Sequence, residues 1–158
     1  MGVPSYGRGG GNYVPSRGRV LHVLGSLDAG GVENWLLELV RHRSPSDRAF
    51  DFFLLGSHEG AYAGELRRRG CRIVRCPLGP FFSFPARLFA LLLRSGYEIV
   101  HSHVHPFSGL ILAIARAAGI PYRLAHSHNT HDGREDRFRR RLYRRLMQWC
   151  LLRWMTLG

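Results

Sequence analysis

Residues 19–42 read RVLHVLGSLDAGGVENWLLELVRH, and their pattern indicates the fold class. The apolar, β-branched run at 19–25 predicts a buried strand. From residue 31 to 42 the apolar residues recur with helical spacing, which predicts a helix. Its apolar residues are placed on one face by that spacing: Val32, Trp35, Leu36, Leu39 and Val40. A strand followed closely by a helix is the repeating unit of α/β proteins.

The same alternation recurs along the rest of the chain. Further strands are predicted at 50–56, 71–77, 97–103 and 122–128, with helices at 60–69, 85–96, 108–119 and 134–155. Each step between strands is long enough for a covering helix, which favours parallel pairing with right-handed crossovers. We therefore expect an α/β fold, a Rossmann-like open parallel sheet of about five strands with flanking helices. Ligands bind beyond the carboxyl ends of the strands in such sheets.

Length and composition indicate one folded unit. The 158 residues are 45% hydrophobic, which suits a packed core. Residues 1–18 are rich in glycine, proline and arginine and predict a disordered tail, leaving 19–158 as the domain. The odd set of three cysteines favours a reducing compartment. With no signal-peptide pattern and no apolar run of about 18 residues, we expect a cytoplasmic protein.

The positive charge is concentrated at the two ends of the chain. All 23 basic residues are arginine, against 11 acidic residues, for a net charge of +12. Residues 20–133 hold 12 of these arginines and nine carboxylates, a balance of only +3. Nucleic acid is therefore not an expected partner, because the central part of the chain is nearly neutral.

The predicted terminal helix has an apolar face and a basic face. Its apolar residues are Phe138, Leu142, Leu146, Trp149 and Cys150, and its basic residues include Arg137, Arg141, Arg144 and Arg145. The favoured interpretation is that the apolar face packs on the sheet. In the alternative, residues 134–154 lie on anionic lipid at the inner face of the membrane.

A glycine pair follows the first predicted strand. Gly30 and Gly31 stand just before the helix at 31–42, where free N–H groups and the helix dipole favour an anion such as a diphosphate. The spacing is neither GxGxxG nor the Walker pattern, which disfavours nicotinamide dinucleotides and ATP hydrolysis. A plain turn with a helix cap is the alternative interpretation.

Histidines stand at the ends of the fourth and fifth predicted strands, in HSHVHP at 101–106 and HSHNTH at 126–131. Alternate residues of a strand share a face, so His101 and His103 point one way, as do His126 and His128. Imidazole pairs suit zinc, but no cysteine pair or clear carboxylate accompanies them, and we expect no metal. Histidine otherwise donates to sugar hydroxyls or phosphate, or acts as an acid or base.

Together these motifs resemble the N-terminal half of glycosyltransferase family 4, the retaining two-domain GT-B enzymes, particularly those of exopolysaccharide synthesis. The resemblance covers roughly residues 19–131 and is carried by GGVE, HSHVH and AHSHNT. It implies hexosyl transfer from a nucleotide diphosphate sugar, a co-substrate rather than a cofactor, to a glycan or lipid-linked acceptor.

The resemblance also implies roles for individual residues. Gly30 and Gly31 match the glycines against the donor diphosphate, and His103 matches the catalytic histidine that faces the transferring sugar. The remaining positions fall on the acceptor side: His101, His105, His126, His128 and Asn129. These roles are expectations about side chains at the carboxyl ends of the strands.

The family's second domain, with an Arg/Lys pair and an E-x7-E element that bind the donor, is not found in these 158 residues. We therefore expect a truncated product, a fragmentary gene or half of a split enzyme, inactive alone because the charge clamp on the diphosphate is missing. Two other functions stay open. One is a non-enzymatic basic module for polyanion, nucleic acid or membrane, and the other is a zinc-dependent hydrolase.

Overall fold

The computed structural model describes residues 18–77, 83–126 and 138–156. Strands and helices alternate there as predicted. The strands are β1 (Arg19–Leu24), β2 (Ala49–Leu54), β3 (Arg72–Arg75), β4 (Tyr97–Ser102) and β5 (Tyr122–Ala125). The helices are α1 (Gly31–His42), α2 (Ala63–Arg68), α3 (Ser83–Ser95), α4 (Ser108–Ala117) and α5 (Phe138–Trp154), with a short 3-10 helix η1 (His105–Phe107). The predicted tail lies outside the described residues apart from Gly18.

The five strands form one parallel sheet in the order β3-β2-β1-β4-β5. From β1 the chain builds outward through β2 to β3, and α3 then returns it to the other side of β1, where β4 pairs. The predicted Rossmann-like sheet is thereby confirmed. Because the direction of winding reverses between β1 and β4, a crevice is expected at the carboxyl ends of these two strands.

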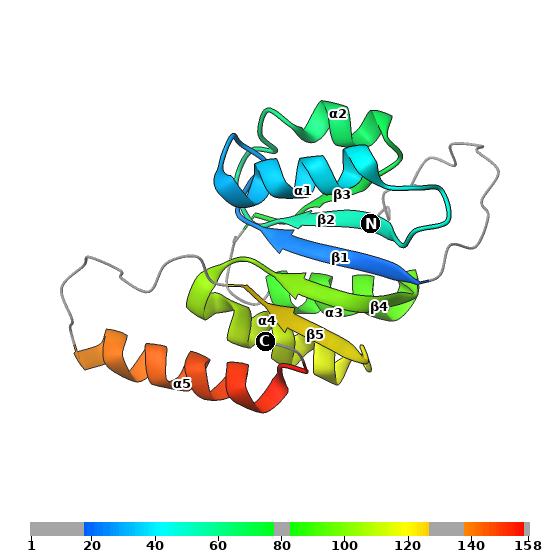
Figure 1. Ribbon diagram of the computed structural model, residues 1–158. Coiled ribbons are helices and arrows are strands. Elements are labelled where there is room, and N and C mark those ends of the chain that lie inside the picture. Colours follow the sequence, from blue (N-terminus) through cyan, green and yellow to red (C-terminus); the bar gives the residue numbers. More distant parts are fainter. Residues whose placement is uncertain (1–17, 78–82, 127–137, 157–158) are drawn as a thin grey trace, which may run out of the picture.

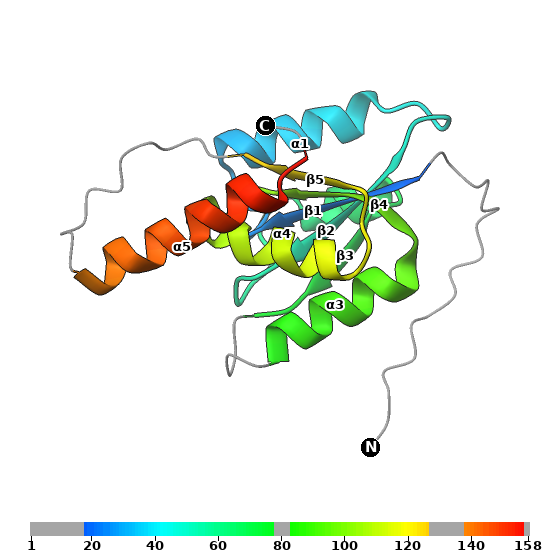
Figure 2. The same ribbon diagram turned by 90° about the horizontal axis from the view of Figure 1, so that it is seen from below.

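Helices cover both faces of the sheet (Figures 1 and 2). On one face, α1 and α2 enclose a core that includes Leu24, Phe52 and Leu36. On the other face, α3 and α4 pack over Leu21 and Val100. Side chains alternate between faces along a strand, so neighbouring residues of β1 contribute to opposite cores.

The buried face of α1 differs from the one predicted. Leu36 and Val40 are buried as part of the core, but Leu37 joins them, while Trp35 and Leu39 are exposed. Half of the residues of this helix carry apolar side chains, so spacing alone did not fix which side meets the sheet. As a result, Trp35 is exposed and does not belong to the core between α1 and the sheet.

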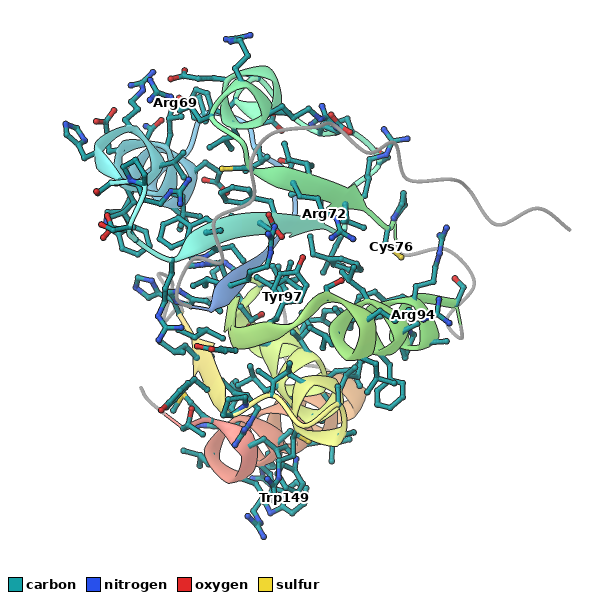
Figure 3. The ribbon with its side chains drawn as sticks, turned by 90° about the vertical axis from the view of Figure 1, so that its right-hand side faces the viewer. Arg69, Arg72, Cys76, Arg94, Tyr97 and Trp149 are labelled. Atoms are coloured by element: carbon teal, nitrogen blue, oxygen red, sulfur yellow. The ribbon has the colours of Figure 1, made fainter. Side chains whose placement is uncertain are left out.

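The packing face of α5 also differs from the prediction. Met147 is buried and Leu151 and Trp154 pack against the core, whereas Leu146 and Trp149 are exposed. The reason lies in the close approach of α5 to α4. A Cβ atom at Gly109 would come within 2.5 Å of the Met147 carbonyl oxygen, so only glycine allows this contact. Figure 3 shows Trp149 projecting away from the sheet.

A buried carboxylate joins the strands near their amino ends, at the opposite end of the sheet from the expected crevice. Asp51 on β2 is fully buried and accepts hydrogen bonds from the Arg19 guanidinium at 2.5 Å and the Tyr97 hydroxyl at 2.8 Å. The backbone N–H of Arg72 donates to the same carboxylate at 3.0 Å. Figure 3 shows Tyr97 between the strands. One charged group thus links β1, β2, β3 and β4.

Candidate functional site

Histidines line the junction between β1 and β4. His22 of β1 and His101 of β4 are register partners. Immediately beyond, the backbone N–H of His103 donates to the Val23 carbonyl at 2.9 Å, and that of His126 donates to the Ser102 carbonyl at 2.9 Å. Backbone pairing therefore sets the positions of these histidines along the sheet edge.

The four imidazole rings form a cluster, which we call the histidine cluster: His22, His101, His103 and His126. Nδ1 of His22 lies 3.2 Å from Nε2 of His103, a hydrogen bond between two buried side chains. The ring centroids of His101 and His103 are 4.1 Å apart, and that of His126 lies 6.1 Å and 5.9 Å from them. The predicted convergence of residues 101, 103 and 126 is therefore observed.

Burial keeps the inner part of the histidine cluster neutral. The pKa of His22 is lowered well below its usual value, first by burial and then by His103 and His101. The pKa of His101 is lowered to about 4, again chiefly by burial and then by His126. A neutral imidazole offers one N–H donor and one lone pair, so both rings present hydrogen-bonding groups without a charge near pH 7.

Trp35 borders the histidine cluster from α1. Its side chain is 44% exposed, and its ring centroid lies 6.3–6.5 Å from those of His101, His103 and His126, at steep interplanar angles. An exposed indole beside hydrogen-bonding imidazoles combines an apolar surface with polar groups. Ligand sites of small molecules are commonly built from this mixture.

The glycine pair stands at the start of the same helix. Gly30 caps α1 in an extended conformation, and its carbonyl accepts a 2.9 Å hydrogen bond from the Asn34 N–H. A Cβ atom added to Gly31 would find no atom within 4 Å. The backbone at Gly31 is therefore open, and Trp35 follows it by about one helical turn.

The loop that carries the glycine pair is held by the loop after β2. The Leu27 N–H donates to the Glu59 carbonyl at 2.7 Å, and the Tyr62 N–H donates to the Leu27 carbonyl at 3.0 Å. Gly60 has φ +96°, and a Cβ atom there would lie 2.2 Å from the carbonyl carbon of Leu27. Glycine is thus required for the two loops to touch.

The remaining predicted residues lie elsewhere or are not described. His105 is exposed at the start of η1 with φ +49°, so the chain has already left the extended path of β4. His128 and Asn129 lie outside the described residues. Sequence reasoning missed His22 and the placement of Trp35. The available signal for His22 was a single polar residue inside the apolar run RVLHVLG.

A comparison with protein families matches residues 30–154 to the glycosyl transferase 4-like domain. This match covers most of the chain and includes the glycine pair, Trp35 and the cluster residues other than His22. The chain belongs to the glycosyl transferase 4-like family. The predicted family resemblance is therefore confirmed.

Two curated bacterial proteins with glycosyltransferase names are similar to this glycosyl transferase 4-like chain. The protein named "Putative glycosyltransferase EpsF" of Bacillus subtilis (strain 168) is 33% identical over 140 residues, 84% of this chain and 36% of that protein. The capsular polysaccharide biosynthesis glycosyltransferase CapH of Staphylococcus aureus is 27% identical over 120 residues, 75% of this chain and 33% of CapH. The chain thus spans about a third of the length of these relatives.

A solved structure shares the fold of this glycosyl transferase 4-like chain. The crystal structure of Anabaena Alr3699/HepE in complex with UDP and glucose superimposes with a TM-score of 0.60 at 15% identity, over 89% of this chain and 37% of that protein. At this identity the likeness concerns the fold. In the described part of the chain, no helix combines the length and apolarity needed to cross a membrane.

Proposed function

We propose that this domain is the acceptor-side half of a retaining glycosyltransferase acting in exopolysaccharide or cell-surface glycan synthesis. The enzyme would transfer a sugar from a nucleotide diphosphate sugar to an acceptor hydroxyl. The observation that carries the proposal is the histidine cluster at the β1–β4 junction, beside the open N-terminus of α1. Family membership and the two relatives named as glycosyltransferases, one of them for capsular polysaccharide biosynthesis, support the same chemistry.

The reaction needs stabilisation at two points. The bond from the sugar C1 to the diphosphate oxygen breaks, a bond from C1 to the acceptor oxygen forms, and the proton of the acceptor hydroxyl passes to the departing diphosphate. The N-terminus of α1 at Gly31 suits the departing diphosphate, whose negative charge grows as the bond breaks. The Glu33 carboxylate lies against Gly30 and would have to turn away for the diphosphate to reach that residue. His103 is suited to hydrogen-bond a hydroxyl of the transferring sugar while positive charge develops on the ring.

Acceptor binding is assigned to the side of the histidine cluster that faces solvent. His101 is partly exposed on β4, and His126 follows β5. Their imidazoles can exchange hydrogen bonds with acceptor hydroxyls, and Trp35 offers an apolar surface to a sugar ring. His105, His128 and Asn129 belong to the same side of the proposed site through the family resemblance.

The 158 residues are proposed to be inactive by themselves, because the groups that clamp the diphosphate belong to another domain in the family. The decisive experiment is a chimaera in which residues 19–156 replace the matching third of EpsF. We expect release of nucleoside diphosphate from a nucleotide sugar when acceptor is present, and no release by the isolated chain.

In that chimaera, His103→Ala should reduce turnover by about 100-fold or more, the usual effect of losing a positioned proton donor or acceptor. His42→Ala is the matched control, because His42 lies at the exposed end of α1. A folded chimaera that keeps full turnover with His103→Ala would show that the histidine cluster does not serve the reaction.

A peripheral membrane contact is proposed through the outer side of α5. Leu146, Trp149 and Leu152 are 53%, 57% and 74% exposed, and Arg145 and Arg153 are also exposed there. Apolar and cationic side chains on one side of a helix suit an anionic lipid surface. This contact would hold the domain near a lipid-linked acceptor.

Sedimentation with vesicles tests the membrane contact. The chain should sediment with anionic vesicles and not with neutral ones, and the double variant Trp149→Ser, Leu152→Ser should lose this binding. Leu39→Ser, an exposed leucine on α1, is the control. Equal binding by the double variant and the control would contradict the proposal.

A further inference from the structure

Three histidines of the cluster meet the first requirement of a metal site. His22, His101 and His103 each direct one ring nitrogen so that the three atoms lie within 4.8 Å of one another. Two of the three side chains are buried, and the third is partly buried. The sequence expectation of no metal rested on the lack of a cysteine pair or clear carboxylate beside the histidines at the ends of β4 and β5, and it did not include His22.

The spacing of the nitrogens suits a tetrahedral ion. Zinc binds imidazole nitrogen at about 2.0–2.1 Å, so two ligands of a tetrahedral site lie about 3.4 Å apart. The Nδ1 atom of His22 and the Nε2 atom of His103 already lie 3.2 Å apart. The ligand nitrogen of His101 lies within 4.8 Å of the other two, and His101 is the most exposed of the three residues.

The environment of His22 also favours an ion. Its imidazole is 3% exposed, and within the part of the chain that the structure describes its Nε2 atom has no hydrogen-bond partner. A neutral imidazole binds a metal through the lone pair of one nitrogen and keeps its proton on the other, so His22 can bind through Nδ1 while Nε2 carries the proton. A bond from Nδ1 of His22 to a metal would replace the hydrogen bond between Nδ1 and Nε2 of His103.

The chemistry of the ligands selects the class of ion. Three imidazoles suit Zn²⁺, Cu²⁺ or Ni²⁺, whereas Mg²⁺ and Ca²⁺ require oxygen ligands. Three protein ligands leave a fourth position for water, or for the adjacent His126, whose ring centroid is 5.9 Å from that of His103.

We propose that His22, His101 and His103 bind one late first-row divalent transition-metal ion, with Zn²⁺ the representative. Because the ion would occupy a nitrogen of His103, a loaded site would withhold that side chain from a sugar. Zinc would therefore inhibit the proposed transfer. The binding itself does not depend on the proposed function and is measurable on the chain alone.

The test is a zinc titration of the purified 158-residue chain, without a histidine tag, in competition with a chromophoric chelator. We expect one ion per chain. We also expect cobalt to give the visible absorption of a tetrahedral site. Loss of a residue that only supports a ligand lowers metal affinity by roughly 10–100-fold. His101→Ala removes a ligand itself, so we expect a larger loss of zinc affinity. His101→Cys, which restores a metal ligand, should recover binding and add a sulfur-to-cobalt charge-transfer band.

His22→Asn tests the buried ligand. Because this change also affects the core, the variant can fail to fold, and the variants of the partly exposed His101 then provide the test. His42→Ala and His58→Ala remove exposed histidines outside the cluster and should bind zinc as the unaltered chain does. The proposal is overturned by the absence of stoichiometric zinc. It is also overturned if binding survives His101→Ala unchanged, or if the two control variants abolish it.

Discussion

His22 and His101 are register partners across the β1–β4 pair, and their ring centroids lie 5.3 Å apart. The two strands are far apart in sequence. They become neighbours only because α3 returns the chain from β3 to the side of β1 that does not pair with β2. Partners in adjacent parallel strands share a face, so both imidazoles point toward the α1 side. The composition of the site therefore depends on the winding of the sheet.

Acid should destabilise the domain through the inner histidines. The pKa of His101 is lowered to about 4, and that of His22 is lowered well below the usual value near 6.5. Between these values and about pH 6.5 the unfolded chain binds more protons than the folded chain. The free energy of unfolding is therefore highest above about pH 6.5 and falls as the pH drops toward 4. The slope is at most about 1.4 kcal/mol per pH unit for each histidine.

Urea unfolding at several pH values between 7.5 and 4.5 measures this effect. His101→Asn should flatten the decrease, while His42→Asn, at the exposed end of α1, should leave it unchanged. Identical pH dependence in the unaltered chain and the His101→Asn variant would refute the assignment.

Trp35 should matter for ligand binding more than for stability. Its side chain is 44% exposed, so Trp35→Ala should lower the free energy of unfolding by only about 1 kcal/mol. In the EpsF chimaera the same change should reduce turnover, and Trp35→Phe should retain most of it because an aromatic surface remains. Leu39→Ala, one helical turn away, is the control. If Trp35→Ala and Leu39→Ala have the same turnover, Trp35 does not contact substrate.

Asp51 should be a major determinant of stability. Its carboxylate is fully buried and is bound by Arg19, Tyr97 and the backbone of Arg72. Asp51→Ala leaves these groups without their acceptor and should lower the free energy of unfolding by about 3 kcal/mol or more. Glu38→Ala, which removes an exposed ion pair with Arg41, should change it by less than about 1 kcal/mol. Chemical denaturation compares the two, and similar losses would argue against the buried network.

Gly109 should fix the position of α5. Gly109→Ala places a Cβ atom 2.5 Å from the Met147 carbonyl oxygen and should destabilise the domain by about 1–3 kcal/mol, despite the higher helix propensity of alanine. Gly31→Ala meets no atom within 4 Å and should be neutral or stabilising by up to about 1 kcal/mol. Limited proteolysis should detect earlier cleavage around α5 in Gly109→Ala alone. Equal protection of both variants would contradict this packing argument.

The order of strands and helices was predictable because apolar periodicity is a local property of the chain. The helix at 31–42 was predicted with its observed bounds, and the strand ends differ by a few residues. The gathering of His101, His103 and His126 was also predictable, since parallel strands end at the same edge of a sheet. The roles of these histidines in sugar transfer remain predictions.

Local sequence patterns were sufficient to predict a parallel α/β sheet, a glycine pair at the start of a helix, and histidines at the carboxyl ends of the strands. Long-range packing was needed to place His22 and Trp35 beside those histidines. It also set the face of α5 that packs, which contains Met147, Leu151 and Trp154 and not Leu146 and Trp149. Hydrophobic spacing specifies that a helix or strand has a buried side. Which residues complete that side depends on the neighbours brought by distant parts of the chain, such as β4 beside β1 and Gly109 beside α5.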